Sequence, residues 1–272
     1  MSDHSASTSH PARRHALVTG ASSGIGAATV RRLAAAGWHV TGVARRADRL
    51  EALAADTGCS VHVLDVTDDA AVAGLADVLR ASRESGAPPV DAVVLNAGLA
   101  IGVDPVVEAS TADWARMFDV NVLGAQRVLR VLVPMLRDTA RVRGGADIVA
   151  VTSTAGQRAY EGGAGYSASK AGLRIMMDAL RLELAGEPLR VMQVAPGMVR
   201  TDEFTLNRLG GDAERAAALY EGVDRPLTAD DVARVIVDAL GLPAHINVDE
   251  VTMRPVAQAA QHKLVRGPLS PR

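Results

Sequence analysis

The sequence contains one cysteine, no strong excess of charge of either sign and no long hydrophobic run. Its single cysteine, Cys59, excludes an internal disulfide and fits a reducing compartment, so we expect a cytoplasmic protein. The formal net charge of -2, with acidic and basic residues interspersed, argues against a nucleic-acid partner. No apolar stretch approaches the roughly 18 residues that a membrane-spanning helix needs, so we expect no membrane partner.

Aromatic residues make up only 3% of the chain, although hydrophobic residues together make up 48%. The core must therefore be filled by valine, leucine, alanine and isoleucine. A length of 272 residues suits one α/β domain. Residues 1–13 lack hydrophobic periodicity and an apolar segment, which predicts a disordered tail and not a signal peptide. The tail histidines, His4 and His10, are expected to be solvated, and we predict no metal site.

Short apolar strands alternate with helical patterns along the rest of the chain. Strands are expected at 15–19, 39–44, 60–64, 91–95, 147–152, 189–194 and 246–253, with helices between them at positions that include 25–36, 69–83, 110–137 and 165–185. This alternation predicts an α/β fold, a doubly wound and Rossmann-like parallel sheet of about seven strands with helices on both faces. Ligands bind such sheets at the carboxyl ends of the strands. The residues expected along that edge are Gly20, Arg45, Asp65, Asn96 and Ser153.

A glycine-rich loop, Gly20-Ala21-Ser22-Ser23-Gly24-Ile25-Gly26, lies between the first predicted strand and the first predicted helix. Glycines in this position let the backbone approach a pyrophosphate closely, and the helix N-terminus offers free N–H groups to it. The loop therefore predicts a dinucleotide site. A plain glycine-rich turn is the alternative.

The strand 39–44 ends in Ala44 and is followed at once by Arg45 and Arg46. In dinucleotide-binding folds an acidic residue at this strand end holds the ribose 2′-hydroxyl of NAD, whereas a nearby arginine accommodates the 2′-phosphate of NADP. The two arginines therefore predict that NADP (NADPH) is preferred over NAD. The alternative is that both are solvated residues opening the next helix.

Tyr166 and Lys170 are four residues apart in a predicted helix, so their side chains should lie on one face. At about 4 Å and an effective dielectric of about 20, their attraction would be worth roughly 4 kcal/mol, or up to about three pKa units. We therefore expect Lys170 to lower the pKa of Tyr166 and make it an acid–base catalyst near neutral pH. An ordinary surface pair is the alternative.

Three further features ask for an explanation. Asn121 lies inside the predicted helix 110–137, where asparagine has no propensity advantage. Segment 198–227 is a long excursion, which predicts a substrate lid. Residues 257–272 are predicted to be a C-terminal tail, with irregular structure from Arg254 onward.

Together these residues resemble the classical short-chain dehydrogenase/reductase family over residues 14–256. The resemblance rests on Thr19-Gly20-x-x-x-Gly24-Ile25-Gly26, Asp65, Asn96-Ala97-Gly98, Asn121, Ser153, Tyr166-x-x-x-Lys170 and Pro196-Gly197, in the order and spacing of the family. Two positions depart from it: Leu95, where the family often has asparagine, and Ser23, where NADP-dependent members often have a basic residue. The second departure leaves the cofactor prediction resting on Arg45 and Arg46.

The resemblance implies a role for each matching residue. The implied catalytic residues are Asn121, Ser153, Tyr166 and Lys170. Ser153 would hold a carbonyl oxygen and Tyr166 would give it a proton; Lys170 would bond the ribose, and Asn121 would hold a water that links Lys170 to solvent. The implied cofactor-binding residues are Gly20, Ser22, Ser23, Gly24, Ile25, Gly26, Arg45, Arg46, Asp65, Val66, Asn96, Ala97, Gly98, Tyr166, Lys170, Pro196, Gly197, Val199 and Thr201.

The implied reaction is hydride transfer between NADP and a small carbonyl or secondary-alcohol substrate, as in ketone or aldehyde reductases and alcohol or 3-hydroxy acid dehydrogenases. Segments 155–163, 201–204 and 242–247 resemble the narrower group of NADP-dependent 3-hydroxy acid, serine and clavulanate-type dehydrogenases. Candidate substrate contacts are Leu99, Gly156, Tyr160, Met198 and segment 202–227, with Arg158 or Arg200 for a carboxylate. The family also implies a homodimer or homotetramer through the helices at 111–137 and 165–185. A catalytically idle NADP-binding regulator of the same fold is the alternative.

Overall fold

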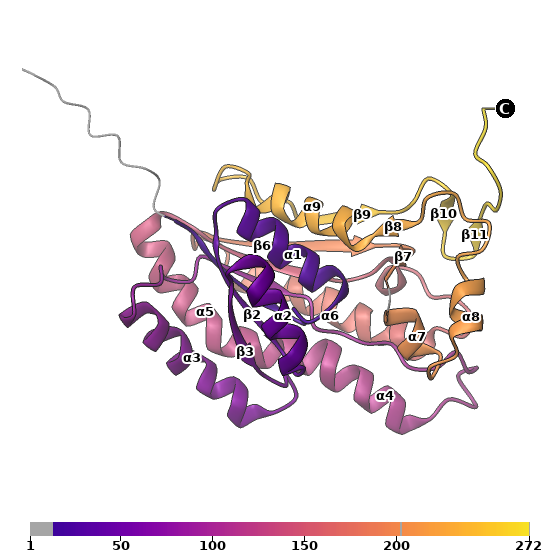
Figure 1. Cartoon of the computed structure of the whole chain (residues 1–272), viewed down its shortest axis with the longest axis horizontal. Coiled ribbons are helices and arrows are strands. Elements are labelled where there is room, and N and C mark those ends of the chain that lie inside the picture. Colours follow the sequence, from indigo (N-terminus) through magenta and orange to yellow (C-terminus); the bar gives the residue numbers. More distant parts are fainter. Residues whose placement is uncertain (1–12, 202, 272) are drawn as a thin grey trace, which may run out of the picture.

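The structure, a computed structural model, describes residues 13–201 and 203–271. Most of the predicted N-terminal tail, residues 1–12, lies outside the described residues. Within them, the chain forms a parallel sheet with helices on both faces (Figure 1). This architecture confirms the predicted fold class.

The central sheet has seven strands in the order β3-β2-β1-β4-β5-β6-β9, and every neighbouring pair is parallel. The strands are β1 His15–Thr19, β2 His39–Ala44, β3 Ser60–Val63, β4 Ala92–Leu95, β5 Ala146–Val151, β6 Leu189–Pro196 and β9 Glu250–Met253. The order of strands reverses between β1 and β4, since β2 and β3 lie on one side of β1 and the later strands on the other. Doubly wound sheets bind ligands at the carboxyl ends of the strands beside such a reversal.

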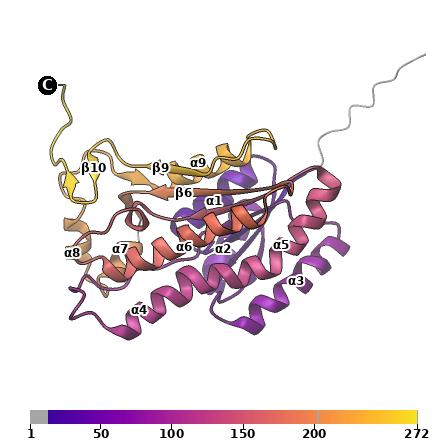
Figure 2. The same ribbon diagram turned by 180° about the vertical axis from the view of Figure 1, so that it is seen from behind.

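Two helical layers cover the sheet (Figures 1 and 2). One layer contains α3 Asp69–Glu84, α4 Thr111–Phe118, α5 Gly124–Arg143 and α6 Ala164–Glu183, and the other contains α1 Gly24–Ala35, α2 Ala47–Thr57 and α9 Ala229–Leu240. Aliphatic side chains fill both interfaces, as the low aromatic content requires; Leu132 and Leu173 are fully buried in the first, and Leu33 and Ile236 in the second. No helix among the described residues is long and apolar enough to cross a membrane.

Local sequence explains where several helices begin and end. The Asp68 side chain accepts hydrogen bonds from the first turn of α3, and Thr228 forms a capping box with Asp231 at the start of α9. Helices α2 and α5 end at Gly58 and Gly144, both with positive φ.

The predicted helix 110–137 is corrected by the structure. A π-helical segment, Asp119–Leu123, separates α4 from α5, and α5 continues to Arg143. Asn121 lies in this segment and is fully buried. Single π turns inside α-helices occur frequently at functional sites. The unusual position of Asn121 in the sequence therefore marks an irregular turn of the helix.

Two segments beyond β6 lie at the carboxyl ends of the strands (Figure 1). Segment 198–227 contains β7 Val199–Arg200, α7 Phe204–Arg208 and α8 Ala213–Ala218, and β7 pairs with β8 Leu227–Thr228. The expectation of irregular structure after Arg254 is wrong, because β10 Gln258–Ala260 and β11 Lys263–Leu264 form an antiparallel pair. The backbone N–H of Met198 donates to Gln258 Oε1 at 2.9 Å, so the two segments support each other.

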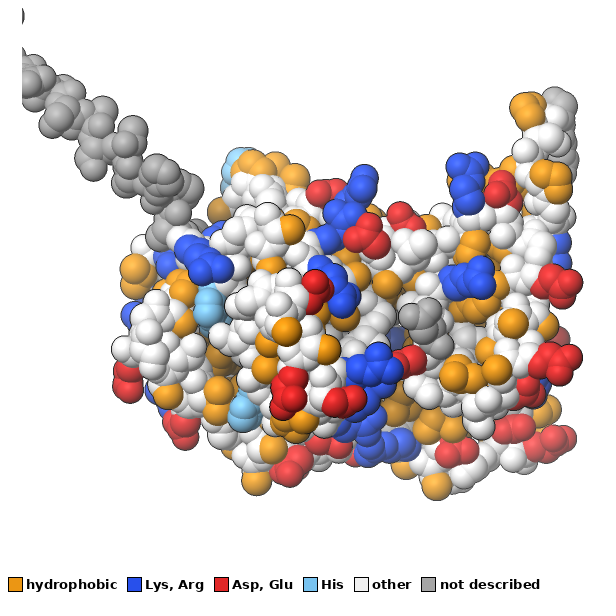
Figure 3. Space-filling model, viewed as in Figure 1, with side chains coloured by type: hydrophobic (Ala, Val, Ile, Leu, Met, Phe, Trp, Pro, Cys, Tyr) orange, Lys and Arg blue, Asp and Glu red, His pale blue; other side chains and the backbone are white. Residues whose placement is uncertain are grey.

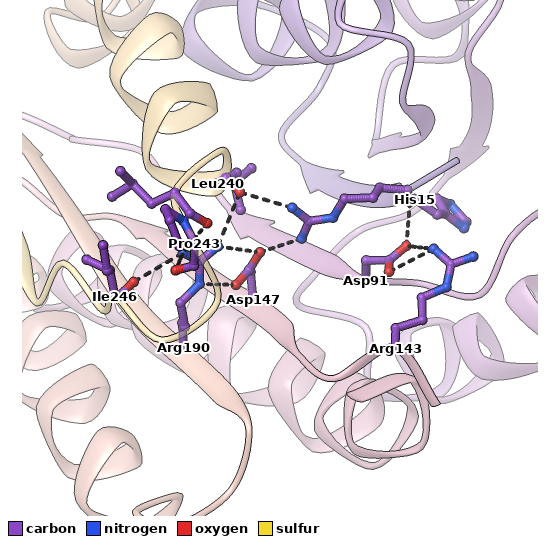
Figure 4. Close-up of polar contacts among 10 residues, drawn as sticks. His15, Asp91, Arg143, Asp147, Arg190, Leu240, Pro243 and Ile246 are labelled. Atoms are coloured by element: carbon purple, nitrogen blue, oxygen red, sulfur yellow. Dashed lines mark hydrogen bonds and ion pairs between the residues drawn. The ribbon is translucent and has the colours of Figure 1, made fainter. Parts of the chain in front are cut away.

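The opposite edge of the sheet contains a group of ion pairs that we call the amino-edge network (Figure 4). Its members are Arg14, Asp91, Arg143, Asp147 and Arg190. Asp147 accepts from Arg190 Nε at 2.6 Å and also from Arg14, while Asp91 accepts from Arg143 and from the backbone N–H of His15. Arg190 also donates to the backbone carbonyls of Leu240, Leu242, Pro243 and Ile246. The network thus joins the sheet to the loop after α9.

Candidate active site

A cavity of about 1150 Å³ opens at the carboxyl ends of the strands. It is lined by all the predicted cofactor residues except one: Gly20, Ser22, Ser23, Gly24, Ile25, Arg45, Arg46, Asp65, Val66, Asn96, Ala97, Gly98, Tyr166, Lys170, Pro196, Gly197, Val199 and Thr201. The exception is Gly26, which is buried in the first turn of α1. The fold therefore brings together residues that are up to about 180 positions apart in the sequence, as parallel-strand topology requires.

The glycine loop is packed tightly against the end of β4. A Cβ at Gly26 would stand 2.3 Å from the carbonyl oxygen of Gly20 and 2.5 Å from Asn96 Nδ2. Asn96 Nδ2 donates to Thr19 O at 2.9 Å and more weakly to Gly20 O. The asparagine therefore joins the ends of β1 and β4 and shapes the loop. Its position explains why Gly26 cannot carry a side chain without displacing backbone.

The N-terminus of α1 faces the cavity without a side-chain cap. Ser23 occupies the cap position but its hydroxyl makes no capping hydrogen bond, and no acidic residue lies in the first turn. Instead, Ser23 Oγ accepts a hydrogen bond from Arg46 Nη2 at 2.9 Å. Free backbone N–H groups at a helix N-terminus attract anions, phosphate among them.

Of the two arginines predicted to bind a 2′-phosphate, Arg46 is the one that contacts the glycine loop. Its guanidinium donates to the hydroxyls of Ser22 and Ser23 and pairs with Glu203 at 2.8 Å. Arg45 is more exposed and lies 4.0 Å from Asp65. Burial acts to raise the pKa of Asp65, but hydrogen bonds from Thr67 and the charge of Arg45 outweigh it, so this pKa is lowered. Figure 3 shows basic side chains gathered between α2 and α7, beside a hollow in the surface.

The structure contradicts the expected effect of Lys170 on Tyr166. Burial raises the pKa of Tyr166 to about 12, while a hydrogen bond from Ser153 acts to lower it. Burial also lowers the pKa of Lys170 to about 8. Lys170 Nζ donates to the backbone carbonyl of Val151 at 2.8 Å, so it is directed to the end of β5 and not to the phenol. The four-residue spacing alone did not reveal this desolvation of both groups.

Asn121 fixes the backbone of the segment between β4 and α4 at Leu99. Its amide accepts from the N–H of Leu99 at 2.8 Å and donates to the carbonyl of Leu99 and to Ser169 Oγ, each at 2.9 Å. A Cβ on Gly98 would lie 3.1 Å from Asn121 Oδ1 and 3.3 Å from Lys170 Nζ. Asn121 and Lys170 thus converge beneath Gly98. The water assigned to Asn121 by resemblance stays a prediction.

Ser153 is buried two residues after the end of β5, at the start of a short 3₁₀ turn. Its hydroxyl accepts a hydrogen bond from the N–H of Ala155 at 3.1 Å and lies 3.5 Å from the carbonyl oxygen of Pro196. The influence of Ser153 on the pKa of Tyr166 indicates that the two hydroxyls are neighbours. A hydroxyl next to a protonated phenol can position an oxygen atom between two donors.

The predicted substrate contacts are only partly brought to the cavity. Leu99, Tyr160 and Met198 line it, whereas Gly156 and Arg158 do not. Gly156 packs against α6, where a Cβ would stand 2.7 Å from the carbonyl carbon of Lys170.

A basic residue of the predicted lid segment, Arg208, lies close to Tyr166, although the sequence did not single it out within that segment. Its guanidinium carbon lies 6.0 Å from the centre of the Tyr166 ring. Arg208 donates to the hydroxyl of Tyr160 at 2.6 Å and to the backbone carbonyls of Gly102 and Gly162. Arg200 also lines the cavity but stacks on Tyr220. Nothing in the local sequence distinguished Arg208 from the other arginines of the segment.

The C-terminal residues Gln258 and Gln261 also line the cavity and were missed. Gln258 supports Met198, and Gln261 Oε1 accepts a hydrogen bond from Thr154 Oγ1 at 2.9 Å. Both lie in the segment expected to be irregular, and neither belongs to a recognisable motif.

Comparison with known proteins gives a consistent result. The model of the short chain dehydrogenase family matches residues 14–208. An uncharacterized oxidoreductase of Mycobacterium tuberculosis is 48% identical over 257 residues, which cover 94% of this chain and 97% of that protein. The serine 3-dehydrogenase of Agrobacterium fabrum is 40% identical (89% of this chain, 94% of that protein), and the NADP-dependent 3-hydroxy acid dehydrogenase YdfG of Salmonella typhi is 37% identical (89% and 95%).

Among solved structures, the closed form of serine dehydrogenase complexed with NADP+ superposes with a TM-score of 0.82 at 34% identity. The match covers 93% of this chain and 99% of that one. The similarity therefore extends over nearly the whole described chain, including the segments beyond β6.

Proposed function

The chain belongs to the short-chain dehydrogenase family, as its sequence predicted, and from this we propose that it transfers a hydride between NADP and a carbonyl or secondary-alcohol carbon. The observation that carries this proposal is the placing of Tyr166 and Lys170 on the wall of the cavity that the glycine loop also lines. When bound, the nicotinamide supplies or accepts the hydride. The protein's contribution is to bind, to orient and to move the proton.

The residues present fit such a cofactor. The uncapped start of α1 and the glycine loop suit a pyrophosphate. Thr201 Oγ1 is buried on the cavity wall and has no hydrogen-bond partner among the described residues, which suits a polar group of a ligand. Arg46, with Ser22 and Ser23, suits a 2′-phosphate, and this supports NADP over NAD. The relative and the solved neighbour named above with NADP agree.

We propose that Tyr166 donates a proton to the substrate oxygen. With a pKa raised to about 12, its phenol is protonated at neutral pH and can donate to an oxygen on which negative charge develops. The Ser153 hydroxyl would hold the same oxygen. Lys170, whose pKa burial lowers to about 8, lines the same cavity and would bond the ribose of the bound cofactor. Oxidation of an alcohol by the same residues requires the phenolate and is therefore favoured at alkaline pH.

Arg208 supports a substrate that carries an anionic group. It lines the cavity beside Tyr160 and near Tyr166, and a guanidinium binds a carboxylate with two parallel hydrogen bonds. A small carbonyl compound whose carboxylate lies a few bonds from the reacting carbon would reach both Arg208 and Tyr166. Serine and 3-hydroxy acids, named in the relatives, have this form. Segment 198–227, which carries Arg208, would act as the lid over this substrate.

We also propose that the protein forms an oligomer. The outer faces of α5 and α6 carry exposed aliphatic side chains; Ile175 is 60% exposed and Leu182 is 80% exposed (Figure 2 shows these helices). Family membership and this face support a homodimer or homotetramer. Light scattering of Leu182→Glu should show a smaller particle than the unaltered protein; an unchanged mass would exclude this face. The lone cysteine, Cys59, is buried and supports a cytoplasmic location.

The test is an absorbance assay of purified protein in both reaction directions. For reduction, NADPH or NADH is supplied with small ketones, semialdehydes or uncharged aldehydes. For oxidation, NADP or NAD is supplied with serine or 3-hydroxy acids. We expect turnover with the phosphorylated cofactor and a preference for substrates with a carboxylate. Arg208→Met should raise KM for the acids by about 10- to 100-fold, while KM for uncharged aldehydes should stay nearly constant. Arg158→Met, which changes an arginine outside the cavity, is the control. Equal loss on charged and uncharged substrates would remove the assignment of Arg208.

A further inference from the structure

Helix α7 spans the cavity from the arginines to Tyr166. Glu203, its N-cap residue, pairs with Arg46 at 2.8 Å and with Arg49 at 3.6 Å. Phe204 packs edge-on against Tyr166, with 5.7 Å between ring centres. Arg208, the last residue of the helix, contacts Tyr160. One short helix therefore touches the phosphate-binding candidates at one end and the substrate-binding candidates at the other.

The carboxylate of Glu203 takes up donors of Arg46 that a phosphate would need. Nε and Nη2 of Arg46 already donate to Ser22 and Ser23, and Nη1 is the nitrogen that faces Glu203. Glu203 is also the more enclosed partner, since its side chain is 23% exposed and that of Arg46 is 41% exposed. A carboxylate and a phosphate dianion on one guanidinium repel each other, so the two cannot share this site without a loss of binding energy.

Because this arrangement rests on the proposed NADP site, it bears on how the enzyme selects its cofactor. We propose that Glu203 is an internal competitor for the 2′-phosphate site, which the phosphate of NADP(H) displaces and the hydroxyl of NAD(H) does not. In the cofactor-free protein the carboxylate ties the start of α7 to α2. Arrival of the 2′-phosphate releases that end of α7, whose other end carries Arg208. Glu203 is thus a specificity-determining residue that connects cofactor identity to the position of the substrate-binding helix.

The charge of Glu203 sets the direction of the expected effects. Removing it should strengthen binding of the phosphorylated cofactor, because Arg46 no longer has to exchange one anion for another. It should leave NADH almost unaffected, because a ribose hydroxyl does not compete for the guanidinium. It should also loosen α7 in the cofactor-free protein. Pairs at this degree of exposure are worth up to about 1 kcal/mol, which corresponds to changes of roughly fivefold.

The experiment measures dissociation constants of NADPH and NADH by calorimetry for the unaltered protein, Glu203→Gln and the control Glu214→Gln. Glu214 carries the same charge on the next helix, α8, and is exposed. We expect Glu203→Gln to lower the Kd of NADPH by about 2- to 5-fold, with NADH and the control unchanged. Hydrogen exchange of the α7 amides in the cofactor-free protein should accelerate by a similar factor in Glu203→Gln only.

A double variant adds a second test. When Arg46→Met is already present, Glu203→Gln should no longer change NADPH binding, because the contested donor is gone. Weaker NADPH binding by Glu203→Gln would make Glu203 a clasp that holds the cofactor and would overturn the proposal. Equal tightening of NADPH and NADH would overturn it as well. If the unaltered protein binds neither cofactor, or prefers NADH, the proposed function fails; an NADPH preference that Glu203→Gln does not change refutes only this inference.

Discussion

The two edges of the central sheet use buried polar groups in opposite ways. At the amino edge, Asp147 and Arg190 are almost fully buried, and each forms ion pairs or hydrogen bonds within the protein (Figure 4). At the carboxyl edge, Tyr166 and Lys170 line a cavity of about 1150 Å³. Among the residues that the structure describes, no carboxylate is one of the groups that shift the pKa of either residue.

This difference indicates which edge of the sheet has polar groups available to interact with a ligand. A buried charge that is paired contributes to a unique fold, and little of its interaction energy is available to a bound molecule. A buried group that is not neutralised has a shifted pKa, as Tyr166 and Lys170 do, and gains most from a partner that arrives later. The following predictions test whether the amino edge governs stability and the carboxyl edge governs activity.

The largest expected effect is on activity at the carboxyl edge. Tyr166→Phe removes the proton donor and should lower kcat by about 10²- to 10⁴-fold. NADPH affinity and the unfolding midpoint should stay nearly constant, because the ring and its contact with Phe204 are retained. Initial rates, calorimetry and thermal unfolding measure the three quantities. Near-normal turnover by this variant would refute the acid–base role.

The next effect is on stability at the amino edge. Arg190→Ala leaves Asp147 buried and only partly paired, which should lower the free energy of unfolding by about 3–5 kcal/mol. Turnover per folded molecule should be unchanged. Urea unfolding measures the loss, with Arg80→Ala as the control because Arg80 belongs to an exposed pair with Asp77. A similar small loss in both variants would mean that the amino-edge network contributes little.

The pH dependence of stability should separate the edges further. Burial lowers the pKa of His15 from 6.5 to about 4, so the folded protein keeps this ring neutral while the unfolded chain protonates it. The unfolded chain therefore binds more protons, and stability present above pH 6.5 is lost as the pH falls through about 4. This difference between the pKa of 6.5 in the unfolded chain and about 4 in the folded protein corresponds to about 3 kcal/mol of stability. Unfolding at several pH values should show a weaker acid dependence for His15→Gln; an unchanged dependence would assign it to other groups.

The smallest expected effect concerns the packing of the glycine loop. Gly26→Ala brings a methyl group against Gly20 O and Asn96 Nδ2, which should destabilise the protein by about 1–3 kcal/mol and weaken NADPH binding. Gly74→Ala is the matched control, since Gly74 lies in α3 and an added Cβ would have no atom within 4 Å, and it should stabilise by roughly 0.5–1 kcal/mol. Equal effects of the two substitutions would show that the loop is not tightly packed.

Sequence patterns alone were sufficient for the order of the elements and for a large group of cavity residues, which includes every predicted cofactor residue except Gly26. Period and composition identified the seven strands of the sheet, because a buried parallel strand must be a short apolar run. Topology then required that residues following those strands meet at one edge. The glycine loop and Ser153 could be placed at that edge for this reason, whereas the roles predicted for Tyr166 and Lys170 rested on their four-residue spacing and on the family resemblance.

Only the tertiary structure decided how these residues behave. The pKa of Tyr166 moved in the direction opposite to the prediction, because desolvation depends on every atom around the phenol and not on the residue four positions away. Arg208 and Gln258 carry no local pattern, and Glu203 was noted only as part of segment 201–204. All three line the cavity because the chain after β6 folds back over the strand ends. Local sequence determines which conformations a segment prefers, whereas burial and charge pairing are set by neighbours that are distant in the chain.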